Sequence, residues 1–226
     1  MHLKGLYIEK TEAALSARTV GYLHATIHNA LKQAVDDAIL TRNVVDTVKP
    51  PQVRREEIEP LKPDQVKTLF ESIREDRCEA LYVVAVTGGP RQGELLGLKW
   101  ADIDLNRCLL QVRRTLSGTK GGDPIFSSPK TAKGSRSVKL TAKAAEALER
   151  HRERQIQERE TLLGLWQDHD LVFPARLGTP MSRHNLVNRS FKPLLRRAGL
   201  PDIRFHDLRH TCATLMLAVG TNPKVV

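Results

Sequence analysis

The sequence predicts a mainly α-helical protein with a small antiparallel β-sheet. One observation is an apolar side chain at every fourth position after Ser16, which is the spacing of an amphipathic helix. A second is the change to alternating apolar and polar residues between Ile103 and Leu140, which is the period of a strand. A third is the apolar content of 40% in 226 residues, which is enough to bury a core in one large or two modest domains.

A proline-containing segment divides the chain into two parts. In the first part, the apolar stripe predicts a helix with Ser16 as its N-cap. Pro50 and Pro51 then favour extended backbone, and four charged residues follow at 54–57. The expected segments are a first domain at 1–51, a linker at 52–61 and a second domain at 62–226.

In the second part, predicted helices surround a stretch with the period of strands. Pro63 and Asp64 open a helix, and a more buried helix over 80–86 ends at Gly88-Gly89-Pro90. The glycine-rich residues 118–123 are expected to form a loop between the second and third strands. The other predicted elements are a helix over 94–100, strands over 103–105, 109–112 and 137–140, and helices over 142–163, 183–198 and 206–219.

The composition favours a nucleic-acid partner. With 36 Lys and Arg against 26 Asp and Glu, the formal charge is +10 and the pI is about 9.8, so the protein carries a positive field at cellular pH. Aromatic residues make up 4% of the chain, too few for platforms that stack single-stranded bases. No apolar run approaches a membrane span, and the N-terminus has no signal-peptide core. We expect a cytoplasmic protein without a membrane partner.

The sequence offers no strong metal site. Its three cysteines are far apart and form no C-x-x-C pair, so we expect free core residues in a reducing compartment. His206 and His210 are four apart on a predicted helix, as in zinc hydrolases, but that pattern needs Glu directly after the first histidine. Asp207 stands there instead, and Arg209 would repel the metal. We therefore expect neither a metal nor another cofactor.

Two motifs, far apart in the sequence, carry most of the chemical information. His206-Asp207-Leu208-Arg209-His210 lies near the C-terminus, and Arg91 lies in the run TGGPRQGELLGL at 87–98. Together they resemble the tyrosine recombinase (phage integrase) family, which surrounds one DNA phosphate with two arginines and a histidine. The resemblance implies an integrase-like catalytic domain preceded by part of a helical core-binding domain. It also implies DNA integration and recombination at specific sites, through a phosphotyrosine intermediate, by a homotetramer on duplex DNA.

Arg91 and Arg209 are the candidate catalytic arginines. A phosphodiester under attack passes through a phosphorane whose non-bridging oxygens gain negative charge, and a guanidinium can give them paired hydrogen bonds. Glu94 matches the acidic residue that holds the first arginine in the family. In one departure from the family, two residues rather than one separate the Thr-Gly pair from Arg91, so the preceding loop is expected to bulge.

His206 and Lys130 are the candidate residues for proton transfer. His206 is three residues before Arg209, so both side chains leave one face of a helix, and an imidazole can accept a proton or hydrogen-bond the phosphate. Lys130 lies where the resemblance places the hairpin lysine that protonates the leaving 5′ oxygen. Lys133 is its rival for this role. His210 is expected to pack within the fold.

Basic and amide side chains near these motifs are candidate DNA contacts. Arg183, His184 and Asn185 open a helix whose first turn is suited to the major groove. An ordinary capped surface helix is an equally good interpretation of this segment. Lys133 and Arg136 complete the predicted set of DNA-binding residues.

The family's second histidine and nucleophilic tyrosine have no counterpart in the sequence. In the family they follow the His-x-x-Arg motif, whereas Tyr7, Tyr22 and Tyr82 all precede Arg91. We therefore expect a chain that is truncated at both ends and that binds DNA without cleaving it alone. A non-catalytic remnant or regulator that occupies recombination sites is the alternative interpretation.

Overall fold

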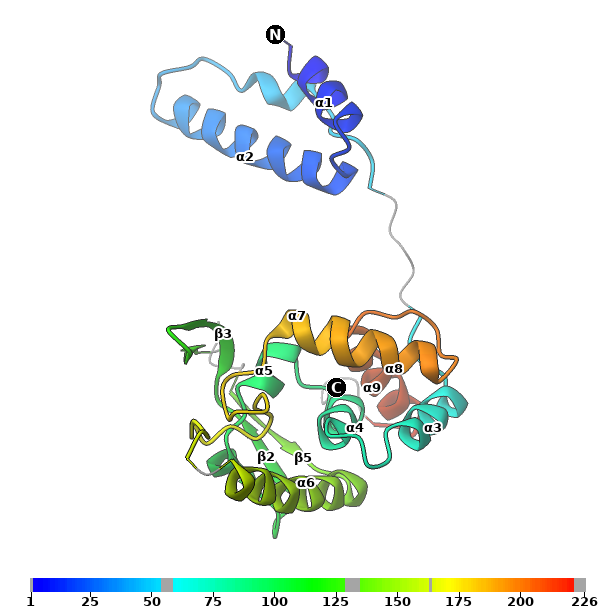
Figure 1. The fold of residues 1–226 in the computed structure, drawn as a ribbon. Coiled ribbons are helices and arrows are strands. Elements are labelled where there is room, and N and C mark those ends of the chain that lie inside the picture. Colours follow the sequence, from blue (N-terminus) through cyan, green and yellow to red (C-terminus); the bar gives the residue numbers. More distant parts are fainter. Residues whose placement is uncertain (1, 54–58, 129–134, 163, 222–226) are drawn as a thin grey trace. The chain divides into compact units, whose positions relative to one another are not determined.

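A computed structural model describes residues 2–53, 59–128, 135–162 and 164–221. The chain divides into two compact units, Met1–Glu57 and Ile58–Val226. Helices dominate both units, and all strands found among the described residues belong to the second (Figure 1). The predicted fold class, mainly α with a small antiparallel sheet, is confirmed.

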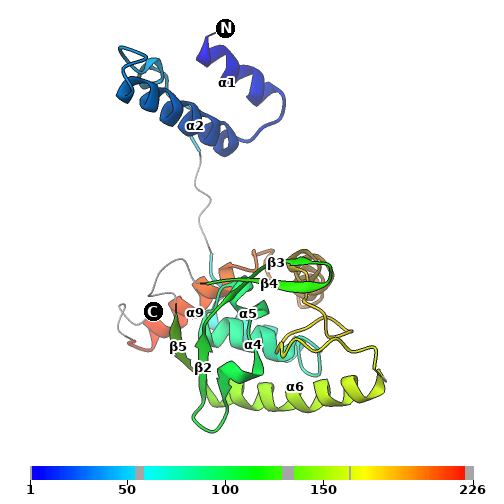
Figure 2. The same cartoon turned by 90° about the vertical axis from the view of Figure 1, so that its left-hand side faces the viewer.

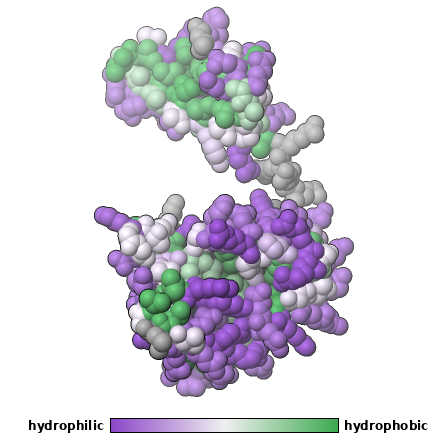
Figure 3. All heavy atoms as spheres, viewed as in Figure 1, coloured by the Kyte–Doolittle hydropathy of each residue, from purple (hydrophilic) through white to green (hydrophobic). Residues whose placement is uncertain are grey.

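The first unit contains α1 (Leu3–Glu12), α2 (Ala17–Asp36) and the 3-10 helix η1 (Val44–Thr47). The predicted N-cap of α2 is confirmed, since Ser16 Oγ accepts a hydrogen bond from Thr19 N at 3.1 Å. The helix α1 was not predicted, because its few apolar residues do not follow a helical period. Tyr7 Oη of α1 lies 3.0 Å from His24 Nδ1 of α2, which links the two helices. Apolar side chains gather on the visible face of this unit (Figure 3).

The central helix of the second unit is α4 (Glu79–Gly88). Residues 79–86 are all buried, and α4 packs against α6 (Ala142–Thr161) and α9 (Asp207–Ala218) (Figure 2). A helix that is apolar on all sides gains most from such a position. The other helices are α3 (Pro63–Ser72), α5 (Gln92–Leu96), the 3-10 helix η2 (Trp100–Asp102), α7 (Arg183–Asn185), the π-helix η4 (Leu186–Phe191) and α8 (Lys192–Arg197).

The predicted strands form one antiparallel sheet in the order β1-β2-β5. These strands are β1 (Ile103–Asp104), β2 (Leu109–Val112) and β5 (Arg136–Lys139). Leu110 of β2 pairs with Ile103 on one side and with Val138 on the other, and it is fully buried. The apolar face of the sheet thus joins the core formed by α4 and α6.

The prediction of a loop over 118–123 was wrong, because this segment belongs to a hairpin. The strands β3 (Thr115–Lys120) and β4 (Asp123–Ser127) pair in a second, two-stranded sheet. Gly121 and Gly122 form its turn, both with positive φ, as two-residue type I′ hairpin turns require. Most of its side chains are exposed or half-buried, so the apolar alternation that reveals a strand is missing.

The predicted helix over 94–100 is also shorter than expected. It ends at Leu96, and a Cβ on Gly97 would lie 2.8 Å from the backbone nitrogen of Leu116 in β3. The hairpin therefore approaches the chain at a position where only glycine leaves room. Tertiary packing, which local periodicity does not report, ends this helix.

The end of α4 depends on Gly89. Its φ of +61° lies in the left-handed region, and its N–H donates to the carbonyl oxygen of Ala85 at 3.2 Å. A Cβ at this position would lie 3.2 Å from the Sγ atom of Cys212 in α9. Glycine thus stops α4 and brings the following loop directly against α9.

We expect Gly89→Ala to lower the free energy of unfolding of the second unit by about 2 kcal/mol, because left-handed backbone is unfavourable for side chains and the new Cβ crowds Cys212. Gly199→Ala is the matched control, since Gly199 has a φ of +65° but nothing within 4 Å. Its loss should be about 1 kcal/mol. Urea unfolding followed by tryptophan fluorescence measures both losses, because Trp100 and Trp166 belong to the second unit. Equal losses would contradict the role of the Cys212 contact.

Candidate functional site

The candidate site is built around the carboxylate of Glu94, which is 3% exposed. Glu94 is the third residue of α5, and its Oε2 accepts a hydrogen bond from the backbone nitrogen of Arg91 at 2.8 Å. Its Oε1 accepts a second bond from Nη1 of Arg91 at 2.9 Å. Arg136, the first residue of β5, donates to both oxygens, at 2.8 and 3.3 Å. One buried carboxylate therefore holds two arginines from different elements.

These contacts keep Glu94 ionised. Burial alone would raise the pKa of Glu94, but hydrogen bonds from Arg136 and Arg91 outweigh it and lower that pKa. The Arg91 side chain is 58% exposed, and its ion pair with buried Glu94 sets its orientation. The arrangement thus presents a guanidinium of defined direction to solvent.

Arg209 of α9 also lies at the candidate site. Its Nη1 donates to the carbonyl oxygen of Gly89, in the loop just before Arg91. Burial lowers the pKa of Arg209, and the charges of Arg136 and Arg91 lower it further. The structure therefore brings together the two arginines predicted from the sequence, with Arg136 as a third.

His206 lies at the N-terminus of α9 and is exposed. Its ring lies 5.3 Å from that of His210, in an edge-to-face arrangement. Partial desolvation and the charges of His210 and Arg209 lower the pKa of His206. This lower pKa favours the uncharged imidazole, which is the form that can accept a proton.

Asp207 was missed as a structural anchor by sequence reasoning. It is 5% exposed and accepts hydrogen bonds from the backbone nitrogen of Arg204 at 2.8 Å and from its Nη2 at 2.9 Å. Burial alone would raise the pKa of Asp207, but these bonds lower it. A carboxylate three residues after a basic residue at a helix start was the available signal. Asp207 thereby fixes the turn from which His206 and Arg209 project.

The remaining predicted site residues are two lysines that follow the β-hairpin in the sequence and three residues that open the helix at 183. Lys130 and Lys133 lie outside the described residues. Arg183 donates to the carbonyl oxygen of Leu116, and a Cβ on Gly93 would lie 2.5 Å from its Nη2, so its guanidinium fills the space beside α5.

All three residues of this helix start, Arg183, His184 and Asn185, are exposed. His184 is exposed and lies 3.0 Å from the side-chain nitrogen of Asn188. Asn185 is also exposed, and Ser182 Oγ caps its backbone nitrogen at 3.4 Å. Capping and an exposed basic turn thus occur together, so both interpretations of this helix stay open.

A pocket of about 290 Å³ borders Arg136 and Arg209. Its wall includes Gly89, Arg136, Arg209 and Cys212, with Met216 on the apolar side. The positive charge of the site therefore extends into a partly apolar hollow, where electrostatic interactions are stronger than in open water.

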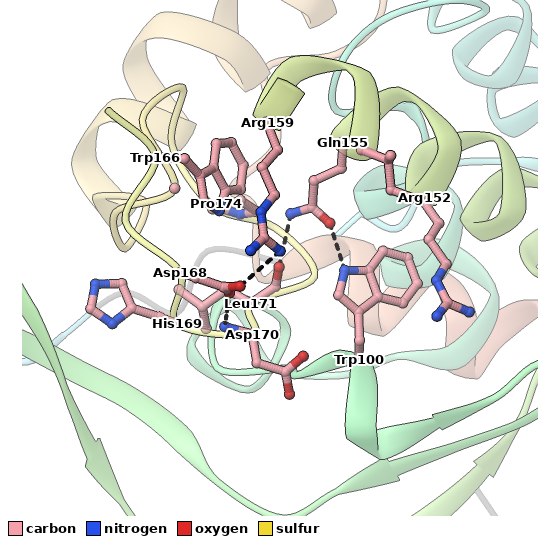
Figure 4. Close-up of a pocket in the computed structure, with 12 residues that line it drawn as sticks. Trp100, Arg152, Gln155, Arg159, Trp166, Asp168, His169, Asp170, Leu171 and Pro174 are labelled. Atoms are coloured by element: carbon pink, nitrogen blue, oxygen red, sulfur yellow. Dashed lines mark hydrogen bonds and ion pairs between the residues drawn. The ribbon is translucent and has the colours of Figure 1, made fainter. Parts of the chain in front are cut away.

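A second pocket, of about 220 Å³, lies between α6 and residues 166–178 (Figure 4). Trp100 Nε1 donates to Gln155 Oε1 at 2.5 Å, and Arg159 pairs with Asp168 at 2.9 Å. Two carboxylates, those of Asp168 and Asp170, and two arginines, Arg152 and Arg159, line this pocket. The pocket therefore offers a phosphate no net positive charge, unlike the site around Glu94.

Within the described ranges, no group of three or more His, Cys, Asp or Glu residues is arranged to hold a metal ion. No helix there is long and apolar enough to cross a membrane.

Comparison with protein families gives a match to the phage integrase family over residues 59–226. Among curated proteins, the tyrosine recombinase XerC-like protein of Caldanaerobacter subterraneus subsp. tengcongensis is 30% identical over 243 residues, covering 100% of this chain and 62% of the relative. The ICEBs1 integrase of Bacillus subtilis is 32% identical over 212 residues, covering 92% and 56%. The chain thus spans about three fifths of the length of these relatives.

Solved structures share the fold. The Tn1549 transposon integrase in complex with a circular intermediate DNA has a TM-score of 0.82 at 22% identity, covering 99% of this chain and 74% of that chain. A lambda integrase dimer bound to a COC' core site has a TM-score of 0.64 at 20% identity, covering 99% and 73%.

We expect Glu94→Gln to lower the free energy of unfolding by about 3 kcal/mol at pH 7, because two arginines lose their buried counter-charge. The pKa of Glu94 is depressed in the folded state, so its contribution is present above the ordinary value of 4.5 and is lost as pH falls through the folded value. The difference between wild type and variant should therefore shrink from pH 7 to pH 3 in urea unfolding. Glu149→Gln, at an exposed position of α6, is the control. A difference independent of pH would contradict an ionised Glu94.

Proposed function

Because this chain belongs to the phage integrase family, we propose that it is the DNA-binding and phosphate-activating part of a recombinase that breaks and rejoins DNA at specific sites. The resemblance predicted from its two motifs is confirmed at the level of the family. The observation that carries the proposal is the convergence of Arg91 and Arg209, which Glu94 and the carbonyl oxygen of Gly89 orient.

The proposed division of labour follows the two units. Residues 62–226 are the catalytic domain, and residues 1–51 are part of a core-binding domain that holds the DNA, with 52–61 as the linker. The separation of the chain into two compact units supports this division. The exposed side chains of His184 and Asn185 are candidate DNA contacts beside the site.

In the proposed reaction, Arg91 and Arg209 donate hydrogen bonds to the non-bridging oxygens of the scissile phosphate. Their interaction strengthens as these oxygens gain charge in the phosphorane, which lowers the barrier. His206 accepts the proton of the attacking hydroxyl or hydrogen-bonds the phosphate. Lys130 donates a proton to the leaving 5′ oxygen, as the family resemblance implies.

The three tyrosines of this sequence are poor candidates for the family's nucleophile. Tyr82 is buried, its Oη lies 2.6 Å from Ser190 Oγ, and burial raises the pKa of Tyr82. Tyr7 is 3% exposed and bonded to His24, while Tyr22 is exposed on α2. This arrangement of the three tyrosines supports a second candidate function for these 226 residues taken alone, which is binding to recombination sites without cleavage.

Duplex DNA is the proposed partner in either case. The named Tn1549 and lambda integrases were solved with DNA, and the charge of +10 on this chain suits a polyanion. We extend the proposal to the family's homotetramer on DNA and to a cytoplasmic location on the nucleoid.

We expect the affinity for a labelled duplex to fall steeply with salt, because each neutralised phosphate releases counterions. Arg91→Ala and Arg209→Ala should each reduce the slope of log Kobs against log salt by about 0.9, the value for the loss of one cation–phosphate contact. Arg152→Ala on α6 is the control, since this arginine lies over Trp100 in the other pocket. Fluorescence anisotropy measures the slopes. Affinity that does not change with salt would refute the phosphate contacts.

We further expect these 226 residues to form no covalent protein–DNA adduct. A nicked suicide substrate traps such an adduct, which a denaturing gel separates from free protein. Tyr22→Phe is the matched variant, because Tyr22 is the exposed tyrosine. A covalent band in the wild-type lane would overturn the expectation, and its loss in Tyr22→Phe would identify the nucleophile.

A further inference from the structure

Arg136 makes contacts that differ from those of a DNA-binding side chain. The sequence predicted a DNA contact, but the guanidinium donates to both oxygens of Glu94, at 2.8 and 3.3 Å. The Arg136 side chain is 27% exposed, against 58% for Arg91. Two of its nitrogens therefore face the buried carboxylate, whereas Arg91 points a larger part of its surface to solvent.

Arg136 helps to keep Glu94 ionised. Burial has the largest effect on the pKa of Glu94 and would raise it. Among the interactions that lower this pKa, the hydrogen bond from Arg136 has the largest effect. Ionised Glu94 in turn binds Arg91 at its backbone nitrogen and at Nη1. Arg136 can thus act on Arg91 through the carboxylate, without touching DNA.

The backbone of Arg136 is held more firmly than a loop residue would be. It pairs with Val112 of β2 in the sheet, while Arg91 lies at the start of α5, a helix of five residues. Burial has the largest effect on the pKa of Arg209 and lowers it. Among the neighbouring charges that also lower it, that of Arg136 has the largest effect. The sheet therefore supplies a fixed cation beside both candidate phosphate-binding arginines.

We propose that Arg136 is a positioning residue, which holds Arg91 in place through Glu94 and does not contact the phosphate. The proposal deepens the proposed function and rests on it for the role of Arg91 in DNA binding. The positioning itself is a property of the protein without DNA, so the two can be tested separately.

The first experiment measures the pKa of Glu94 by ¹³C NMR of its side-chain carboxyl carbon in the protein without DNA. We expect a value below 4.5 in the wild type, a rise in Arg136→Gln and a smaller rise in Arg136→Lys, which keeps the charge but not the paired hydrogen bonds. Arg152→Gln, on α6, is the control and should leave the value unchanged. The Arg91 Nε–H signal should exchange faster with water in Arg136→Gln than in the wild type.

An unchanged Glu94 pKa and an unchanged Arg91 signal in Arg136→Gln would overturn the proposal. If Arg136→Gln does not fold, Arg136→Lys gives the same decision, because it retains the charge that the buried carboxylate requires. Circular dichroism establishes which variants are folded before the comparison is made.

The second experiment is a double-mutant cycle on the salt dependence of duplex binding. Arg91→Ala and Arg136→Gln should each reduce the slope by about 0.9, and the double variant should also reduce it by about 0.9, because both changes remove the same phosphate contact. A reduction of about 1.8 in the double variant would show that Arg136 binds a phosphate itself and would overturn the proposal. If Arg91→Ala leaves the slope unchanged, the proposed function fails, while the NMR experiment still decides the positioning.

Discussion

The arrangement of the candidate site depends on one ion cluster, the buried carboxylate of Glu94 between Arg91 and Arg136. A buried carboxylate without partners is costly, and an exposed arginine without an anchor samples many rotamers. Joining them satisfies the charge and fixes the direction of Arg91 in the same interaction. Since Glu94 belongs to α5 and Arg136 to β5, this interaction also ties the sheet to the helical core.

The core decides where the cluster lies. Because α4 is buried along its length, its end is fixed, and the left-handed Gly89 turns the chain immediately into α5. The same α4 packs against α9, so Arg209 arrives beside the Gly89 loop, to whose carbonyl oxygen it donates. Arg91 and Arg209, far apart in sequence, therefore lie at the same site because the buried helix α4 and the left-handed Gly89 fix the path of the backbone.

The sequence predicted the fold class and the family, because both depend on patterns that are local: the helical and strand periods, the Arg91 run and the His206–Arg209 spacing. It did not predict the β3–β4 hairpin, whose side chains are too exposed to show an apolar alternation. Nor did it assign Glu94 as the partner of Arg136, because that contact depends on the register of β5 against β2. Partner choice across such distances is a tertiary property, and the roles of Lys130 and Lys133 stay predictions.

The cluster also accounts for the state of its histidine. Arg91, Arg136 and the nearby Arg209 carry three positive charges against the one negative charge of Glu94, and this excess disfavours other cations nearby. Partial desolvation and the charges of His210, Arg209 and Arg91 lower the pKa of His206 and outweigh the opposite effect of Asp207. A phosphate bound between Arg91 and Arg209 would offset that excess and raise the proton affinity of the imidazole. In the proposed reaction, the arginines would thus favour a neutral His206 before the phosphate binds and a protonated His206 once the phosphate is in place.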